Sequence, residues 1–117
     1  MINVSFTQDR ESQSIIMKVS GHANSGEKGK DIICSAASIL CYTLAQSMEF
    51  MYEEGELHKR PHISLKEGDA FVIAKPKTAN YNKCLHAFFI IQVGYFLLAR
   101  SHPDFVELIT FGEPETA

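Results

Sequence analysis

The chain has 117 residues, of which 45% are hydrophobic and 21% charged, a composition typical of a small globular protein. The net charge of −3 at pH 7 supplies no basic surface of the kind that binds nucleic acid, so direct nucleic-acid binding is not expected. We expect one domain over residues 1–112, followed by a short acidic tail over residues 113–117.

Two N-terminal segments have the alternating pattern of half-buried strands. Apolar and polar residues alternate over residues 2–7 and again over residues 14–20, with a polar turn between them. The sequence therefore predicts an antiparallel hairpin at the start of the chain.

Residues 32–53 have the pattern of an amphipathic helix. Asp31 is a favourable N-cap, and Gly55 is a plausible C-terminal stop. Cys34 and Ser38 fall at the border of the apolar face. The apolar side chains that share this face are Ile33, Ala37, Leu40, Cys41, Leu44, Met48 and Met51.

The second half of the chain predicts three strands and one very apolar helix. The strands cover residues 62–65, 70–75 and 105–109, and the helix covers residues 80–100. A helix that is apolar nearly all round is normally buried on several sides, which predicts a subunit interface and a homodimer. Gln92 interrupts its apolar run, which falls short of the roughly 20 residues of a membrane span, so no membrane insertion is expected.

The resulting element order is ββαββαβ. This order predicts an α+β two-layer sandwich, with two helices packed on a mostly antiparallel or mixed sheet. No internal repeat, linker or low-complexity segment interrupts it, in agreement with one domain.

The three cysteines, Cys34, Cys41 and Cys84, indicate reduced thiols rather than disulfides. Cys34 and Cys41 lie seven residues apart on one predicted helix, a rise of about 10.5 Å that is too long for a disulfide. No positively charged and apolar leader precedes the first strand, so a secretory signal is not expected. These observations predict a cytoplasmic protein.

The side chains best suited to catalysis lie within residues 21–34. Three glycines within nine residues mark backbone that bends sharply. His22 stands at the start of this loop, and Cys34 falls at the third position of the predicted helix. Its sulfur there lies beside unpaired N–H groups and the positive end of the helix dipole, which favour a thiolate. The pattern indicates a reactive cysteine with a histidine across the loop.

Less specific explanations exist for the same residues. Cys34 could be a small buried hydrophobic residue, as free cysteines often are, and His22 could be an ordinary turn residue. No Cys-x-x-Cys and no His-Glu-x-x-His spacing is present, and the sequence predicts no metal site. The spacing Gly21-x-x-x-x-Gly26 begins like a phosphate-binding loop, but Glu27 follows where lysine is required.

Several of these residues together resemble the bacterial ribosomal-processing cysteine proteases called Prp, also known as the YsxB-like family. The matching positions are Gly21-His22-Ala23, Gly29-x-Asp31-Ile32-Ile33-Cys34, Ala36, Ala37 and Ser38. Length and element order agree over the whole chain, while Ser35 departs from the alanine expected there. The resemblance implies a cysteine endopeptidase that removes a short N-terminal extension from large-subunit ribosomal protein number twenty-seven.

The resemblance also implies a His-Cys dyad of His22 and Cys34, supported by Asp31 and Ser38, with no cofactor. Asp31 can cap the helix or orient His22, and Ser38 can support the site through a hydrogen bond; the sequence leaves these roles open. The loop over residues 23–30 would order itself around a peptide substrate. Its candidate substrate-contacting residues are Ala23, Asn24, Ser25, Gly26 and Gly29.

Two other functions fit the sequence. A non-catalytic module would bind a ribosomal or peptide partner through its apolar helix and would not need Cys34. A thiol redox sensor would need a resolving cysteine, but Cys41 lies two turns away from Cys34, and Cys84 lies in another element. We therefore rank the peptidase first, the binding module second and the sensor third.

Overall fold

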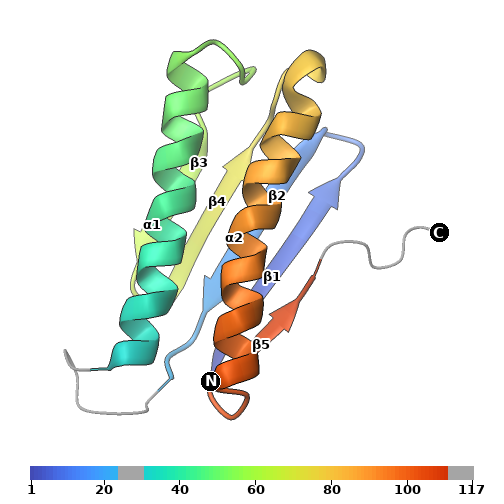
Figure 1. Cartoon of the computed structure of the whole chain (residues 1–117). Coiled ribbons are helices and arrows are strands. Elements are labelled where there is room, and N and C mark those ends of the chain that lie inside the picture. The colour runs from blue at the N-terminus through green and yellow to red at the C-terminus, as the bar shows by residue number, and fades with distance from the viewer. Residues whose placement is uncertain (24–30, 111–117) are drawn as a thin grey trace.

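The computed structural model describes residues 1–23 and 31–110, which form one sheet covered by two helices (Figure 1). The order of strands and long helices is the predicted ββαββαβ. The predicted tail, residues 113–117, lies outside the described residues. In chain order the elements are β1 (Ile2–Asp9), β2 (Ser14–Ser20), α1 (Ile32–Glu53), β3 (His62–Lys66), β4 (Asp69–Ala74), the 3₁₀ turn η1 (Thr78–Asn80), α2 (Tyr81–Ser101) and β5 (Val106–Ile109).

The sheet is mixed, with the strand order β3-β4-β2-β1-β5. β1 pairs antiparallel with β2, β2 with β4, and β4 with β3, whereas β5 lies parallel to β1. Figure 1 shows α1 and α2 side by side on one face of this sheet, so the predicted two-layer α+β sandwich is confirmed. The β2–β4 pairing places Ser20 opposite Asp69, and the end of β2 therefore lies beside the turn between β3 and β4.

Local sequence explains both ends of α1. The side chain of Asp31 accepts a hydrogen bond from the N–H of Cys34 at 3.1 Å, as expected of an N-cap. At the other end Gly55 has a φ of +76°, and its N–H and that of the next residue donate to the carbonyl oxygens of Tyr52 and Met51. These two bonds form a Schellman motif, which satisfies carbonyl groups that the last helical turn leaves without partners.

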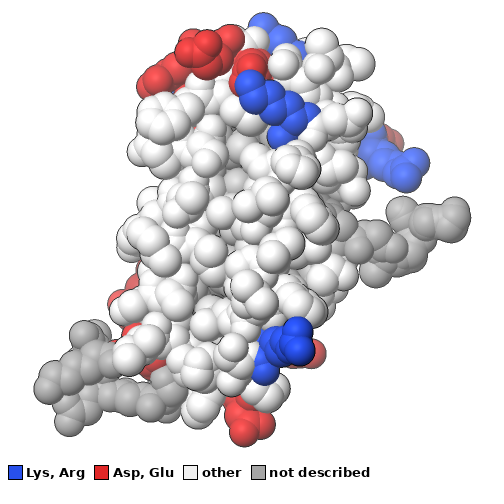
Figure 2. Space-filling view, viewed as in Figure 1, with Lys and Arg blue, Asp and Glu red and all other residues white. Residues whose placement is uncertain are grey.

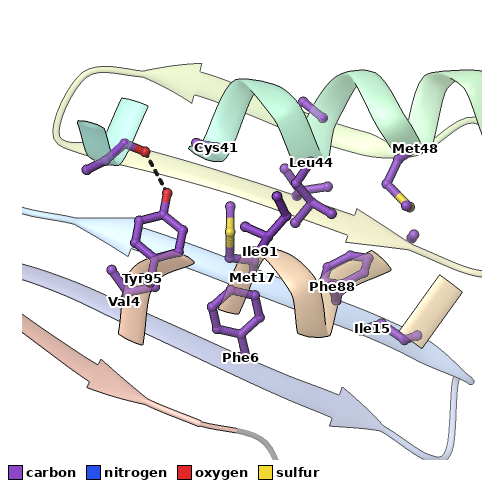
Figure 3. Close-up of a cluster of buried hydrophobic side chains, with 14 of the residues drawn as sticks. Val4, Phe6, Ile15, Met17, Cys41, Leu44, Met48, Phe88, Ile91 and Tyr95 are labelled. Atoms are coloured by element: carbon purple, nitrogen blue, oxygen red, sulfur yellow. Dashed lines mark hydrogen bonds between the residues drawn. The ribbon is translucent and has the colours of Figure 1, made fainter. Parts of the chain in front are cut away.

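The core lies between the sheet and the helices (Figure 3). Every member of the predicted apolar face of α1 is buried except Leu40, which is half-buried, and Ala45 joins this face. A Cβ on Gly94 of α2 would lie 2.6 Å from Leu40 Cδ2, so the absence of a side chain lets the two helices approach closely. Across the same interface the Tyr95 hydroxyl donates a hydrogen bond to the carbonyl oxygen of Ala37 at 2.7 Å. This bond ties α2 to the first half of α1.

Within the described residues only one side of α2 is buried; the predicted subunit interface would cover the other side, and the homodimer stays a prediction. One face packs into the core, while large apolar side chains remain exposed on the opposite face. The buried residues are Cys84, Phe88, Ile91, Gln92 and Tyr95, and the exposed ones are Phe89, Ile90, Val93, Phe96 and Leu97. Among the described side chains, those of Lys, Arg, Asp and Glu gather towards the two ends of the helical face and leave its centre uncharged (Figure 2).

Both helices are long and apolar enough to cross a membrane when only length and composition are considered. The argument from run length against a span in α2 is therefore wrong. Length and hydropathy alone are weak evidence for a membrane span, because a helix that covers a sheet can have the same length and hydropathy. Each helix here packs one apolar face on the sheet, which accounts for part of its hydropathy.

Candidate active site

His22 lies two residues after the end of β2, and hydrogen bonds hold the backbone at both Gly21 and His22. The N–H of Gly21, whose φ is +89°, donates to the carbonyl oxygen of Gly68 in the β3–β4 turn at 3.0 Å. The carbonyl oxygen of His22 accepts a hydrogen bond from the backbone amine of Met1 at 2.7 Å. A side chain on Gly21 would collide with the carbonyl group of Met1, so this position needs glycine for space as well as for conformation. The chain therefore turns sharply out of β2 and exposes the imidazole of His22.

Cys34 lies in the first turn of α1, and its side chain is half-buried. Its backbone N–H donates to Asp31 Oδ1, and the first bond of the helix runs from the N–H of Ser35 to the carbonyl oxygen of Asp31 at 3.0 Å. Asp31 is itself buried. Asp31 therefore takes the capping role that the sequence left open, and Cys34 sits at the electropositive end of the helix.

One pocket of about 770 Å³ is lined by both His22 and Cys34, although these residues come from different elements. The end of β2, the first turns of α1 and the β3–β4 turn surround it. Asp31 and Ser38 line the same pocket. The fold thus brings together all four residues named as catalytic or supporting in the sequence, in a cavity of the size that binds ligands.

Part of the pocket wall is apolar and open to solvent. The side chains of Ile39, Tyr42 and Leu65 line it and are 60%, 48% and 43% exposed. Lys66 and Glu67 add opposite charges. A wall of this kind suits an extended peptide, which presents apolar side chains together with polar backbone groups.

The β3–β4 turn is the part of the site that sequence reasoning missed. The strands predicted over residues 62–65 and 70–75 leave residues 66–69 as their connection, and the chain turns there between the paired residues Lys66 and Asp69. Nothing in the turn itself indicates that His22 lies against it. The available signal was indirect, because only a pairing of β2 with β4 brings the two segments together.

The other two cysteines have environments unlike that of Cys34. Burial raises the pKa of Cys41 to about 11 and that of Cys84 to about 12. The sulfur of Cys84 also contacts the sulfur of Met48 at 3.7 Å in the core. Because the thiolate is the reactive form of cysteine, both buried thiols are almost wholly protonated and inert near neutral pH. They are also poor candidates for the resolving cysteine of a redox sensor.

The remaining predicted site residues differ in their placement. Ser38 is exposed at the pocket, one helical turn after Cys34. Ala23 is buried in the core, so its side chain does not face the solvent. Four predicted loop residues lie outside the described residues: Asn24, Ser25, Gly26 and Gly29.

Residues 1–23 and 31–110 contain no group of three or more His, Cys, Asp or Glu side chains that could hold a metal ion. His58 and His62 are spaced four residues apart, but His62 begins β3, where its ring meets the ring of Phe71 edge-on at 5.0 Å. Such spacing indicates a metal site when both histidines share a helix face, which these two do not. The absence of a metal and of a cofactor remains a prediction.

The sequence profile of the cysteine protease Prp family matches residues 1–106. The chain belongs to this family. Prp proteins are cysteine proteases, and membership makes this chain a cysteine peptidase. No curated protein matches the sequence significantly.

Solved structures share the Prp fold with this chain. SMU.848 from Streptococcus mutans is 25% identical, with a TM-score of 0.66 over 95% of this chain and 94% of its own. The ribosomal processing protease Prp of S. aureus in complex with a covalently linked product peptide is 21% identical, with a TM-score of 0.68. The same protease with a substrate peptide is 19% identical, with a TM-score of 0.64, and each match covers 94% of this chain and 99% of that one. At these identities the S. aureus structures establish the fold alone.

Proposed function

We propose that this protein is an endopeptidase that removes a short N-terminal extension from large-subunit ribosomal protein number twenty-seven, using His22 and Cys34 as a dyad. Membership of the Prp family supports the peptidase chemistry. The S. aureus protein of the same fold is described as an essential ribosomal processing protease, which supports the substrate class. The observation that carries the proposal is the single pocket lined by an exposed imidazole and a half-buried thiol.

In the proposed reaction His22 takes the proton of the Cys34 thiol, and the sulfur attacks the carbonyl carbon of the scissile peptide bond. A C–S bond forms, and the carbonyl oxygen becomes an oxyanion. Collapse of this intermediate breaks the C–N bond, while His22 gives its proton to the leaving amine. Water then hydrolyses the thioester, with His22 again accepting and returning a proton, and the thiol is restored. The reaction needs a reduced thiol, which agrees with the cytoplasmic location that we also propose.

The start of α1 offers N–H groups for the oxyanion. The N–H groups of Ile32 and Ile33 precede the first helical bond and have no partner inside the helix. The N–H of Cys34 is engaged by Asp31. While Asp31 caps the helix, we therefore expect the N–H groups of Ile32 and Ile33, rather than that of Cys34, to stabilise the oxyanion.

Asp31 and Ser38 are proposed as supporting residues. Asp31 fixes the first turn of α1 and thereby the direction of the Cys34 side chain. Ser38 lies four residues after Cys34 on the same side of the helix, where its hydroxyl can bond to the backbone of a peptide in the pocket.

The test is incubation of the purified protein with the ribosomal protein precursor, with the new N-terminus determined by mass spectrometry. The wild type is expected to release the extension, and Cys34→Ala is expected to leave the precursor intact. Cys84→Ala is the matched control, because Cys84 is buried and does not line the pocket. This variant should still cleave the precursor. Cleavage by Cys34→Ala would refute the nucleophile. A failure of the wild type to cleave would favour a non-catalytic binding module.

We also propose that two copies associate through the outer face of α2. The exposed residues Phe89, Val93 and Phe96 lie on this face, and the centre of the helical layer carries no described charge. Exposed apolar surface of this kind is typical of protein interfaces. Sedimentation should give a dimer for the wild type and a monomer for Val93→Glu, with Arg100→Glu at the exposed C-terminal end of α2 as the control. A monomeric wild type at micromolar concentration would contradict this assembly.

A further inference from the structure

The turn between β3 and β4 reaches past the end of β2 and meets the segment that bears His22. Lys66 pairs with Asp69, which leaves Glu67 and Gly68 as the two residues of the turn. Asp69 pairs in turn with Ser20, the last residue of β2. The next residue of that chain, Gly21, donates its N–H to the carbonyl oxygen of Gly68. The turn and the histidine segment are therefore fastened together through their backbones.

The imidazole of His22 lies directly over Gly68. A Cβ on Gly68 would lie 2.6 Å from Nε2, 3.0 Å from Cε1 and 3.5 Å from Cδ2 of His22. Gly68 also has a φ of +81°, which side-chain-bearing residues rarely adopt. The ring thus occupies the space that a side chain on Gly68 would fill.

We propose that Gly68 is a positioning residue for His22: its bare α-carbon forms the platform on which the imidazole rests while facing Cys34 in the pocket. This inference rests on the proposed dyad and adds to it a third segment of the chain, 34 residues after Cys34 in the sequence. A platform of this kind restricts the imidazole to few rotamers before substrate binds. Pre-set geometry matters in such a site, because a displacement of about 1 Å can cost about a hundredfold in rate.

The physical consequence of adding a Cβ at Gly68 falls on the histidine. The predicted close contact is with the far end of the His22 side chain, which can rotate, whereas the backbone of the turn is held by strand pairing. Gly68→Ala should therefore displace the imidazole rather than dismantle the turn. The backbone cost of alanine at positive φ adds to this effect and must be measured separately.

Gly55 supplies the matched control. It has a φ of +76°, close to that of Gly68, yet no described atom lies within 4 Å of the position that its Cβ would take. Gly55→Ala therefore carries the same backbone penalty without a contact to His22. If Gly68→Ala fails to fold, Gly68→Asn replaces it, because asparagine tolerates positive φ and still carries a Cβ.

The experiment measures the rate at which iodoacetamide alkylates Cys34 as a function of pH, in Gly68→Ala and Gly55→Ala, each with and without His22→Ala. We expect Gly68→Ala to lower the rate at pH 7 by about tenfold and to change the pH profile, while Gly55→Ala alters it less than about twofold. In the His22→Ala background, Gly68→Ala should have no further effect. A small reagent is used so that crowding of a peptide by the new methyl group does not contribute.

Two negative outcomes are distinguishable. If His22→Ala lowers the alkylation rate but Gly68→Ala behaves like Gly55→Ala, the platform is refuted and the dyad stands. If His22→Ala has no effect, the dyad itself fails, and the platform fails with it. A full effect of Gly68→Ala in the absence of His22 would also refute the platform, because the glycine would then act on Cys34 by another route.

Discussion

The two ends of α1 are stabilised in different ways. The C-terminal end is closed by the Schellman motif at Gly55 and by the ion pair between Lys83 and Glu56 at 2.6 Å. Arg60 adds a contact over the ring of Tyr52 at 4.7 Å. At the N-terminal end a single side-chain cap from Asp31 is described, and next to it the helix opens onto the pocket.

This difference shows how one helix can serve both stability and chemistry. At the closed end, polar groups are bonded to one another or to salt-bridge partners at the surface. At the open end, the thiol of Cys34 and the imidazole of His22 face a cavity that a substrate can enter. The buried contacts further along the helix, among them Leu44 and Met48, hold the open end in place.

The sharpest test of this difference compares Cys34 at the open end with Cys84, which packs against Met48 towards the closed end. Cys34 should react with iodoacetamide at pH 8 at least about a thousandfold faster than Cys84, because Cys84 is buried and its pKa is raised to about 12. Peptide mapping of the labelled native protein by mass spectrometry gives both rates. Equal labelling of the two residues would mean that the ends do not differ as described.

A second test uses alkaline pH to weaken the core through its two buried thiols, Cys41 and Cys84. In the unfolded chain a thiol loses its proton near pH 8.5, whereas burial holds the pKa of Cys41 near 11 and that of Cys84 near 12. The two buried, protonated thiols therefore make their full contribution to stability below about pH 8.5, and this contribution is lost as the pH rises towards their folded pKa values. Each thiol should lower the free energy of unfolding by about 1.4 kcal/mol per pH unit above pH 9. Urea denaturation between pH 8 and pH 10.5 measures the slope, which Cys84→Ala should reduce by about half; an unchanged slope would contradict this.

A third test loosens the attachment of the open end to α2. Tyr95→Phe removes the hydrogen bond from the buried hydroxyl to the carbonyl oxygen of Ala37, one turn after Cys34. The expected loss of unfolding free energy is about 1 to 2 kcal/mol, measured by urea denaturation. Tyr42→Phe, at a position on α1 that is about half exposed, is the control and should change the free energy of unfolding by less than about 0.5 kcal/mol. Equal effects of the two changes would show that the buried bond contributes little.

A fourth test removes the cap itself. Asp31→Ala should lower the unfolding free energy by about 1 kcal/mol, because the N–H of Cys34 loses its acceptor. Asp31→Asn retains an oxygen that can accept this bond and should keep most of the stability. Thermal denaturation of the three proteins checks both expectations. If the alanine and asparagine variants were equally stable, the hydrogen bond would not be the source of the effect.

Much of the fold could be predicted from sequence because the signals are local. Asp31 and Gly55 flank an apolar pattern, and the helix they predict runs over residues 32–53 as observed. The contact between His22 and Gly68 could not be predicted, because it depends on the pairing of strands far apart in the sequence. The division of α2 into a buried and an exposed face could not be predicted for a related reason: hydropathy reports that a helix is apolar, but not which of its faces the sheet covers.

The central claim is that His22 acts on the sulfur of Cys34. The most direct measurement is the rate of Cys34 alkylation between pH 5 and pH 10 in the wild type and in His22→Ala, with Cys34→Ala as the blank. The wild type should keep a substantial rate below pH 8, and His22→Ala should lose about tenfold or more there. Two superimposable curves that both follow the titration of an ordinary free thiol would contradict the dyad.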